Sequence, residues 1–72
     1  MAYDYTKLTS RIAECCGTQA AFADAMGLSE RSVSLKLNNK VPFKQPEIQK
    51  AVPILGLDEA DILEYFFTIK VQ

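Results

Sequence analysis

Helix breakers divide this sequence into short segments. Gly17, Gly27 and Gly56, together with the loop "NNKVPFK" at residues 38–44, separate stretches of about one to three helical turns. A chain of 72 residues can enclose only one modest apolar core. The sequence therefore predicts a single domain, residues 1–72, in which several short helices share that core.

Apolar residues recur at helical spacing within each segment, which predicts an all-α fold of five short helices. The expected helices cover residues 5–16, 19–26, 30–38, 46–55 and 59–66. The side chains expected to face the core are Leu8, Ile12 and Cys15 in the first helix, Phe22, Ala23 and Met26 in the second, Val33 and Leu37 in the third, Ile48, Ala51, Val52 and Leu55 in the fourth, and Ile62, Leu63 and Phe66 in the last.

Short polar residues mark the start of two of these helices. The hydroxyl groups of Thr18 and Ser29 are placed to accept hydrogen bonds from the first turns of the second and third helices. Gly17 and Gly27 can take the left-handed conformation that ends the first and second helices. These signals predict two helices joined by a tight turn over residues 18–38.

The carboxyl-terminal tail, residues 67–72, has a different period. Phe67, Ile69 and Val71 alternate with polar side chains, which is typical of an extended strand and not of a helix. A lone strand needs a partner. The tail is expected either to lie over its own helices or to pair with another chain, in which case the protein is a homodimer.

Composition excludes several classes of protein. The chain is 49% hydrophobic and 24% charged, which is too apolar for a disordered protein. It has no run long enough to span a membrane and no secretory signal, so we expect a cytoplasmic protein without membrane contact. Histidine is absent, and the two cysteines are adjacent, so we expect no disulfide, metal, cofactor or enzymatic activity.

The charges are distributed unevenly. The net charge is −1, yet residues 27–44 carry four cations and one acid, Glu30. The four cations are Arg31, Lys36, Lys40 and Lys44, whereas four acids cluster at Asp58, Glu59, Asp61 and Glu64. Binding to a polyanion requires positive charge at the contact face, whatever the total charge of the protein. The third helix and its following loop are therefore the expected contact face.

Two helices joined by a glycine-containing turn, with a small residue at their crossing, form the layout of a helix-turn-helix. The stretch "TQAAFADAMGLSERSVSLKLN" resembles the helix-turn-helix of the phage Cro and CI repressor (Xre-type) class. The similarity to small Cro-like phage regulators extends to the terminal "EYFF". This resemblance implies a lambda repressor-like DNA-binding fold. Lys36 departs from it, because many relatives have a buried apolar residue there; we expect Leu37 to take the buried face and Lys36 to lie at its edge.

The resemblance also implies a set of contacts with DNA. The guanidinium of Arg31 fits the two acceptors of guanine, and Ser34 and Leu35 lie on the same outward face, so these three residues are the predicted base contacts. Leu35, expected to be exposed, could contact a thymine methyl group or another protein. The predicted phosphate contacts are Gln19, Ser29, Ser32, Lys36, Asn38, Lys40 and Lys44.

Two functions are consistent with these residues. The leading prediction is a sequence-specific DNA-binding transcriptional regulator, namely a Cro-like phage or prophage repressor that inserts residues 30–38 into the major groove of a double-stranded DNA operator. The alternative is an antirepressor, which binds a partner phage repressor through the helix-turn-helix face and masks the DNA-binding surface of that partner. The low isoelectric point, about 5.2, and the outward Leu35 favour the alternative.

Overall fold

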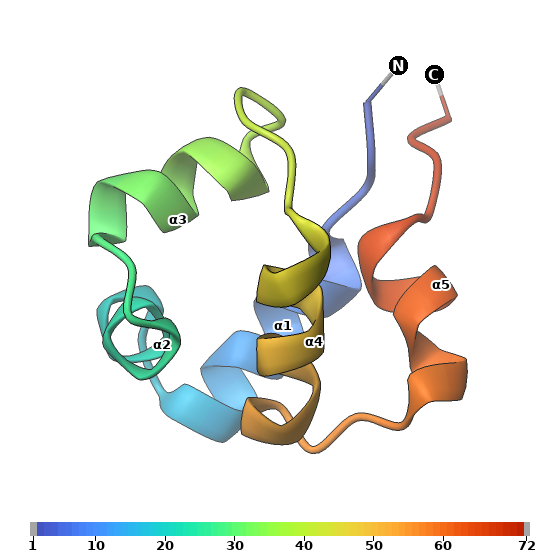
Figure 1. The fold of residues 1–72 in the computed structure, drawn as a ribbon. Helices are drawn as coiled ribbons and strands as arrows, with labels where there is room; N and C mark the ends of the chain where they lie inside the picture. Colours follow the sequence, from blue (N-terminus) through green and yellow to red (C-terminus); the bar gives the residue numbers. More distant parts are fainter. Residues whose placement is uncertain (1, 72) are drawn as a thin grey trace.

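The computed structural model describes residues 2–71, and over this range it shows five α-helices and no sheet (Figure 1). The helices are α1 (Thr6–Cys16), α2 (Gln19–Met26), α3 (Glu30–Leu37), α4 (Gln45–Ile54) and α5 (Ile62–Phe66), and a short 3₁₀ turn, η1 (Glu59–Asp61), precedes α5. The prediction of an all-α fold with five short helices is confirmed. The predicted boundaries of the first four helices agree with the structure to within one residue.

All five helices contribute to one core. In Figure 1, α1 and α4 lie in the middle, α2 and α3 lie on one side, and α5 lies on the other. The largest fully buried side chains are Leu8 of α1, Phe22 of α2, Val33 of α3, Phe66 of α5 and Leu55, which directly follows α4. This arrangement leaves one long side of α3 facing away from the domain.

The predicted capping interactions are present at both helices of the pair. Thr18 Oγ1 accepts a hydrogen bond from the Ala21 N–H at 3.0 Å. Ser29 Oγ accepts one from the Ser32 N–H, also at 3.0 Å. Gly27 ends α2 in the left-handed conformation, with φ of 71°. These local interactions fix where α2 stops and α3 starts.

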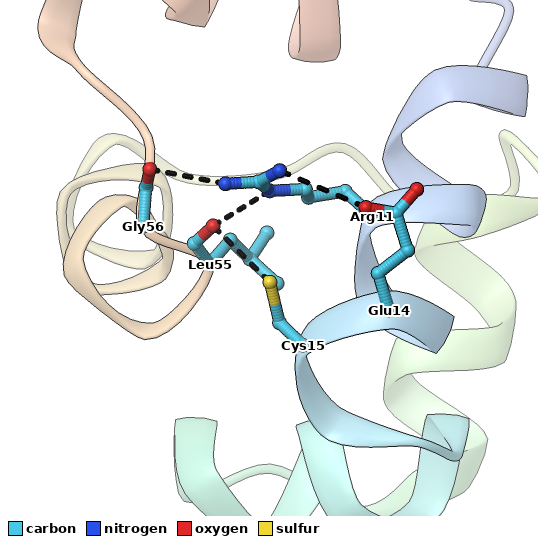
Figure 2. A network of polar contacts seen from close by, with 5 residues as sticks. All are labelled: Arg11, Glu14, Cys15, Leu55 and Gly56. Atoms are coloured by element: carbon cyan, nitrogen blue, oxygen red, sulfur yellow. Dashed lines mark hydrogen bonds and ion pairs between the residues drawn. The ribbon is translucent and has the colours of Figure 1, made fainter.

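Arg11 joins α1 to the end of α4 (Figure 2). Its guanidinium donates hydrogen bonds to the Leu55 carbonyl at 2.8 Å and to the Gly56 carbonyl at 3.2 Å. The thiol of Cys15 lies 3.4 Å from the same Leu55 carbonyl oxygen. A cation at this position stabilises α4, because the last carbonyl groups of a helix have no partner within the helix.

The amino-terminal segment, residues 2–4, and the tail, residues 67–71, lie side by side (Figure 1). The Asp4 N–H donates to the Thr68 carbonyl at 2.7 Å, and the Lys70 N–H donates to the Ala2 carbonyl at 3.0 Å. Tyr3 and Ile69 form an isolated antiparallel bridge between these two hydrogen bonds. The tail is therefore extended, as its alternation predicts, and its partner is the amino-terminal segment of the same chain.

Two side chains predicted to face the core do not. Cys15 is exposed, because Cys16, one turn after Ile12, takes the partly buried position at the end of α1. Leu63 is 74% exposed, because α5 buries the side formed by Ile62 and Phe66. No helix among residues 2–71 is long and apolar enough to cross a membrane.

Candidate functional site

The helix-turn-helix is formed by α2, the turn at residues 27–29, and α3. Ala23 of α2 and Val33 of α3 are both buried where the two helices pack together. A small residue at this position allows close approach of the helices. Val33 therefore faces inward, and the residues at positions 31, 34, 35 and 38 face outward.

We define the recognition surface as positions 31, 34 and 35 of α3 together with the loop at residues 38–44. Among the predicted contact residues, Ser29, Arg31, Asn38, Lys40 and Lys44 are exposed, and Gln19, Ser32 and Ser34 are partly exposed. Leu35 is also only partly exposed, which corrects the expectation of a fully exposed leucine. The predicted contacts of these residues with bases and phosphates stay predictions.

Lys36 is the exception, because its predicted role as a phosphate contact is wrong. Its side chain is buried, with only 4% of the residue exposed. The ammonium group forms an ion pair with Glu47 at 3.0 Å and donates to the Pro42 carbonyl at 3.1 Å. It also lies 5.9 Å from the centre of the Phe43 ring. Lys36 occupies the buried position itself instead of its edge, while Leu37 is only partly buried.

Glu47 makes the burial of Lys36 possible. Its carboxylate accepts hydrogen bonds from the Lys36 ammonium and from the Lys44 N–H, the latter at 2.8 Å, at the start of α4. Burial raises the pKa of Glu47, but these two hydrogen bonds and the positive charges of Lys36 and Lys44 outweigh it, so the pKa lies below its ordinary value. The ionised pair fixes α3, the loop at residues 38–44 and α4 relative to one another.

Asn39 connects the recognition surface to the two ends of the chain. It takes the left-handed conformation, with φ of 62°, directly after α3. Its side chain accepts a hydrogen bond from the Tyr3 N–H at 2.9 Å and donates one to the Tyr3 carbonyl at 3.0 Å. Tyr3 is bridged to Ile69 on its other side. This role of Asn39 is not among the features predicted from the sequence, although asparagine after a helix is a known signal for the left-handed conformation.

A hollow of about 230 Å³ lies beside this junction. Its walls include the aromatic rings of Tyr3, Tyr5, Phe43, Phe66 and Phe67, together with Val41. Neighbouring rings meet edge to face, with Tyr5 and Phe43 5.5 Å apart and Phe43 and Phe66 5.3 Å apart between centroids. The hollow contains no cluster of titratable side chains, and residues 2–71 hold no group of His, Cys, Asp or Glu side chains suited to a metal ion.

Of the four cations between residues 27 and 44, only Lys36 forms an ion pair within residues 2–71. Residues 2–71 contain three ion pairs, which engage Lys7, Arg11 and Lys36. Arg31, Lys40 and Lys44 are exposed and have no carboxylate within 4.0 Å in this part of the chain. The recognition surface is therefore positive, with three free cations, although the chain as a whole is slightly acidic.

The fold and this surface define a small all-α domain in which α2 and α3 form a helix-turn-helix. The chain belongs to the family described as "Protein of unknown function (DUF739)", whose model matches residues 1–69. No curated protein matches the chain. Among solved structures, the chain is similar to the modulator of repression (MOR) of the temperate bacteriophage TP901-1 from Lactococcus lactis. That match has 60% sequence identity and a TM-score of 0.82, and covers 100% of this chain and 97% of the other.

This similarity overturns the first functional prediction. The sequence predicts a sequence-specific, Cro-like DNA-binding repressor, but a solved structure that matches this chain over its whole length is that of a modulator of repression. A helix-turn-helix with clustered cations does not by itself specify DNA binding, because one fold can carry different functions. The alternative prediction, an antirepressor, agrees better with this finding.

Proposed function

We propose that this protein is a bacteriophage modulator of repression that acts as an antirepressor. It binds a partner phage repressor through the recognition surface and masks the DNA-binding surface of that partner, and so it regulates transcription without a catalytic step. One observation carries the proposal, namely the 60% identity over the full chain to the modulator of repression of bacteriophage TP901-1.

The chemistry of the recognition surface supports a protein partner. One of the four cations that the sequence places here, Lys36, is buried and neutralised by Glu47, so it is not available to a phosphate group. Leu35, partly exposed, offers apolar contact area among short polar side chains. Protein interfaces combine a small apolar centre with a polar rim in this way. We further propose that the domain shares its ancestry with Cro-like and Xre-type regulators and has kept their helix-turn-helix as a scaffold.

A gel-shift experiment tests this function. The DNA would be the operator of the repressor encoded beside this gene, and the lanes would contain the repressor, this protein, or both. We expect no shift with this protein alone, a shift with the repressor, and loss of that shift as this protein is added. A slower band that contains both proteins on DNA would contradict masking, and an unchanged repressor band would contradict binding.

A pair of variants locates the contact. Leu35→Ser changes the recognition surface without touching the buried core, and Leu63→Ser makes the same change at an exposed leucine on α5. Because truncation of a side chain at the buried centre of an interface can cost more than about 1 kcal/mol, we expect about five- to tenfold more of the Leu35→Ser variant to be needed to release the repressor from DNA. Leu63→Ser should act like the natural protein. Equal behaviour of both variants would exclude the recognition surface.

A further inference from the structure

The charge of the recognition surface limits what it can contact on a repressor. This step rests on the proposed function, in which the surface binds a repressor and hides its DNA-binding residues. The DNA-contacting surface of any repressor is itself positively charged, because it must attract the phosphate backbone. Like charges placed opposite each other in an interface are strongly unfavourable.

The recognition surface has no internal means of cancelling its own charge. Arg31, Lys40 and Lys44 are exposed and without carboxylate partners among residues 2–71, and the nearest acid along α3 is Glu30 at its first residue. The acidic turn at residues 58–61 lies on the opposite side of the domain, beside α5 (Figure 1). Direct contact between α3 and the basic groove-binding residues of a repressor would therefore bring cations together.

We infer that the recognition surface docks on an acidic patch of the repressor that borders its DNA-contacting residues. Arg31, Lys40 and Lys44 supply the charges of this contact, and Leu35, on the same outward side of α3 as Arg31, supplies apolar area. The repressor is then blocked sterically, by the bulk of this domain, and its basic residues stay unpaired in the complex. Such a surface recognises an acidic protein patch, and its affinity falls as salt screens the attraction.

Charge-neutralising variants test the sign of this interaction. Arg31→Gln/Lys40→Gln removes two exposed cations of the recognition surface, whereas Ala13→Glu/Ala60→Glu lowers the net charge by the same amount on α1 and η1. Lys44 is left unchanged, because it starts α4 beside Glu47. The affinity of each variant for the full-length repressor would be measured by calorimetry at several salt concentrations, with thermal melting as a check on folding.

We expect the recognition-surface variant to bind about five- to tenfold more weakly at low salt, and the matched control to stay within about twofold of the natural protein. The natural complex should weaken as salt is raised. Tighter binding by Arg31→Gln/Lys40→Gln, or a complex that strengthens with salt, would overturn the inference and indicate direct contact with the basic surface of the repressor. In that case binding itself would still support the proposed function.

A third variant tests whether the acidic turn at residues 58–61, and not the recognition surface, contacts the repressor. Glu59→Lys reverses an exposed charge in the acidic turn. If Glu59→Lys weakens the complex and the recognition-surface variant does not, the acidic turn contacts the repressor, and both the inference and the assigned surface are wrong. If the natural protein does not bind the repressor at all, the proposed function fails before the charge question arises.

Discussion

Lys36 and Glu47 form an ion pair that is largely shielded from water, because only 5% of the lysine side chain and 18% of the glutamate side chain are exposed. A buried pair of this kind gains little over two apolar residues, but the loss of one partner leaves a charge without compensation. The stem of Lys36 also fills space beside Val33 in the position that an apolar residue usually takes. The pair therefore determines the orientation of α3 relative to α4 and contributes little to the total free energy of unfolding.

Variants at this pair test that interpretation. Lys36→Met keeps the buried volume but leaves the Glu47 carboxylate unpaired, so we expect the free energy of unfolding to fall by about 3 kcal/mol. In Lys36→Met/Glu47→Gln the side-chain amide oxygen at position 47 can still accept a hydrogen bond from the Lys44 N–H. Neither side chain of the former pair carries a charge. Chemical denaturation should show that this second change restores most of the loss. Equal stability of the single and double variants would mean that the carboxylate is solvated and the pair is unimportant.

Local residues explain why part of the fold could be predicted. Thr18 and Ser29 act on N–H groups three residues away, so their caps are visible in a short stretch of sequence. The burial of Lys36 depends on Glu47, which lies on another helix, and no local pattern reveals that pairing. The departure from the pattern of the Cro and CI repressor class at Lys36 is the most informative local signal, but the sequence alone favours a shift of the buried face to Leu37, and the structure has a buried cation instead.

At the scale of elements, the connection from α3 to the chain ends depends on one side chain. Asn39 ends α3 in the left-handed conformation and holds both backbone groups of Tyr3. Tyr3 in turn pairs with the tail at Ile69. A change in the tail can therefore reach the recognition surface through two neighbouring segments. The alternation of apolar and polar residues predicts that the tail is extended. No local pattern in the sequence indicates that residues 2–4 are its partner.

Substitutions at two adjacent asparagines test this connection. Asn39→Gly keeps the left-handed backbone and removes both hydrogen bonds, so we expect a loss of about 1 kcal/mol of stability. Asn39→Ala should lose about 1 kcal/mol more, because alanine is strained at this φ. Asn38→Ala removes two local, exposed hydrogen bonds, to the carbonyl and the hydroxyl oxygen of Ser34, and should cost about 0.5 kcal/mol or less.

Hydrogen exchange separates this role from a general loss of stability. In Asn39→Gly the Tyr3 amide and the amides of the tail should exchange faster, while the amides of α2 should be unaffected. Uniform acceleration across the domain would show that Asn39 only contributes to global stability. Exchange at Tyr3 equal to that of the natural protein would show that the two hydrogen bonds are unimportant in solution.

The helix at the carboxyl end shows the limit of periodicity in short elements. Ile62, Leu63 and Phe66 all satisfy helical spacing, yet Leu63 is exposed. With only five residues in α5, several apolar faces fit the pattern equally well. Packing against α1 and the preceding 3₁₀ turn selects the face of Ile62 and Phe66. Longer segments such as α1 give a better defined face, and there the error is limited to Cys15 at the last turn.

At the scale of the whole molecule, the absence of histidine determines the response to pH. The chain contains no side chain whose unperturbed pKa lies between about 5 and 8. Burial raises the pKa of Glu47, but its hydrogen bonds with Lys44 and Lys36 and their positive charges outweigh this effect, so the pKa lies below its ordinary value. A folded-state pKa below the unfolded value means that the unfolded chain binds the proton first. The stabilisation is therefore complete above the unfolded pKa and is lost as the pH falls through the folded one.

We expect the free energy of unfolding to be nearly constant between about pH 6 and 8 and to decrease below about pH 4.3, the ordinary pKa of glutamate. Denaturant titrations at a series of pH values would measure this profile for the natural protein and two variants. Lys36→Met/Glu47→Gln should have a shallower decrease in acid, because it lacks the titrating group. Glu59→Gln, which removes an exposed carboxyl group, should keep the slope of the natural protein. An identical acid slope in all three proteins would show that the titration of Glu47 is not coupled to folding, and would remove the ion pair as the element that orients α3 against α4.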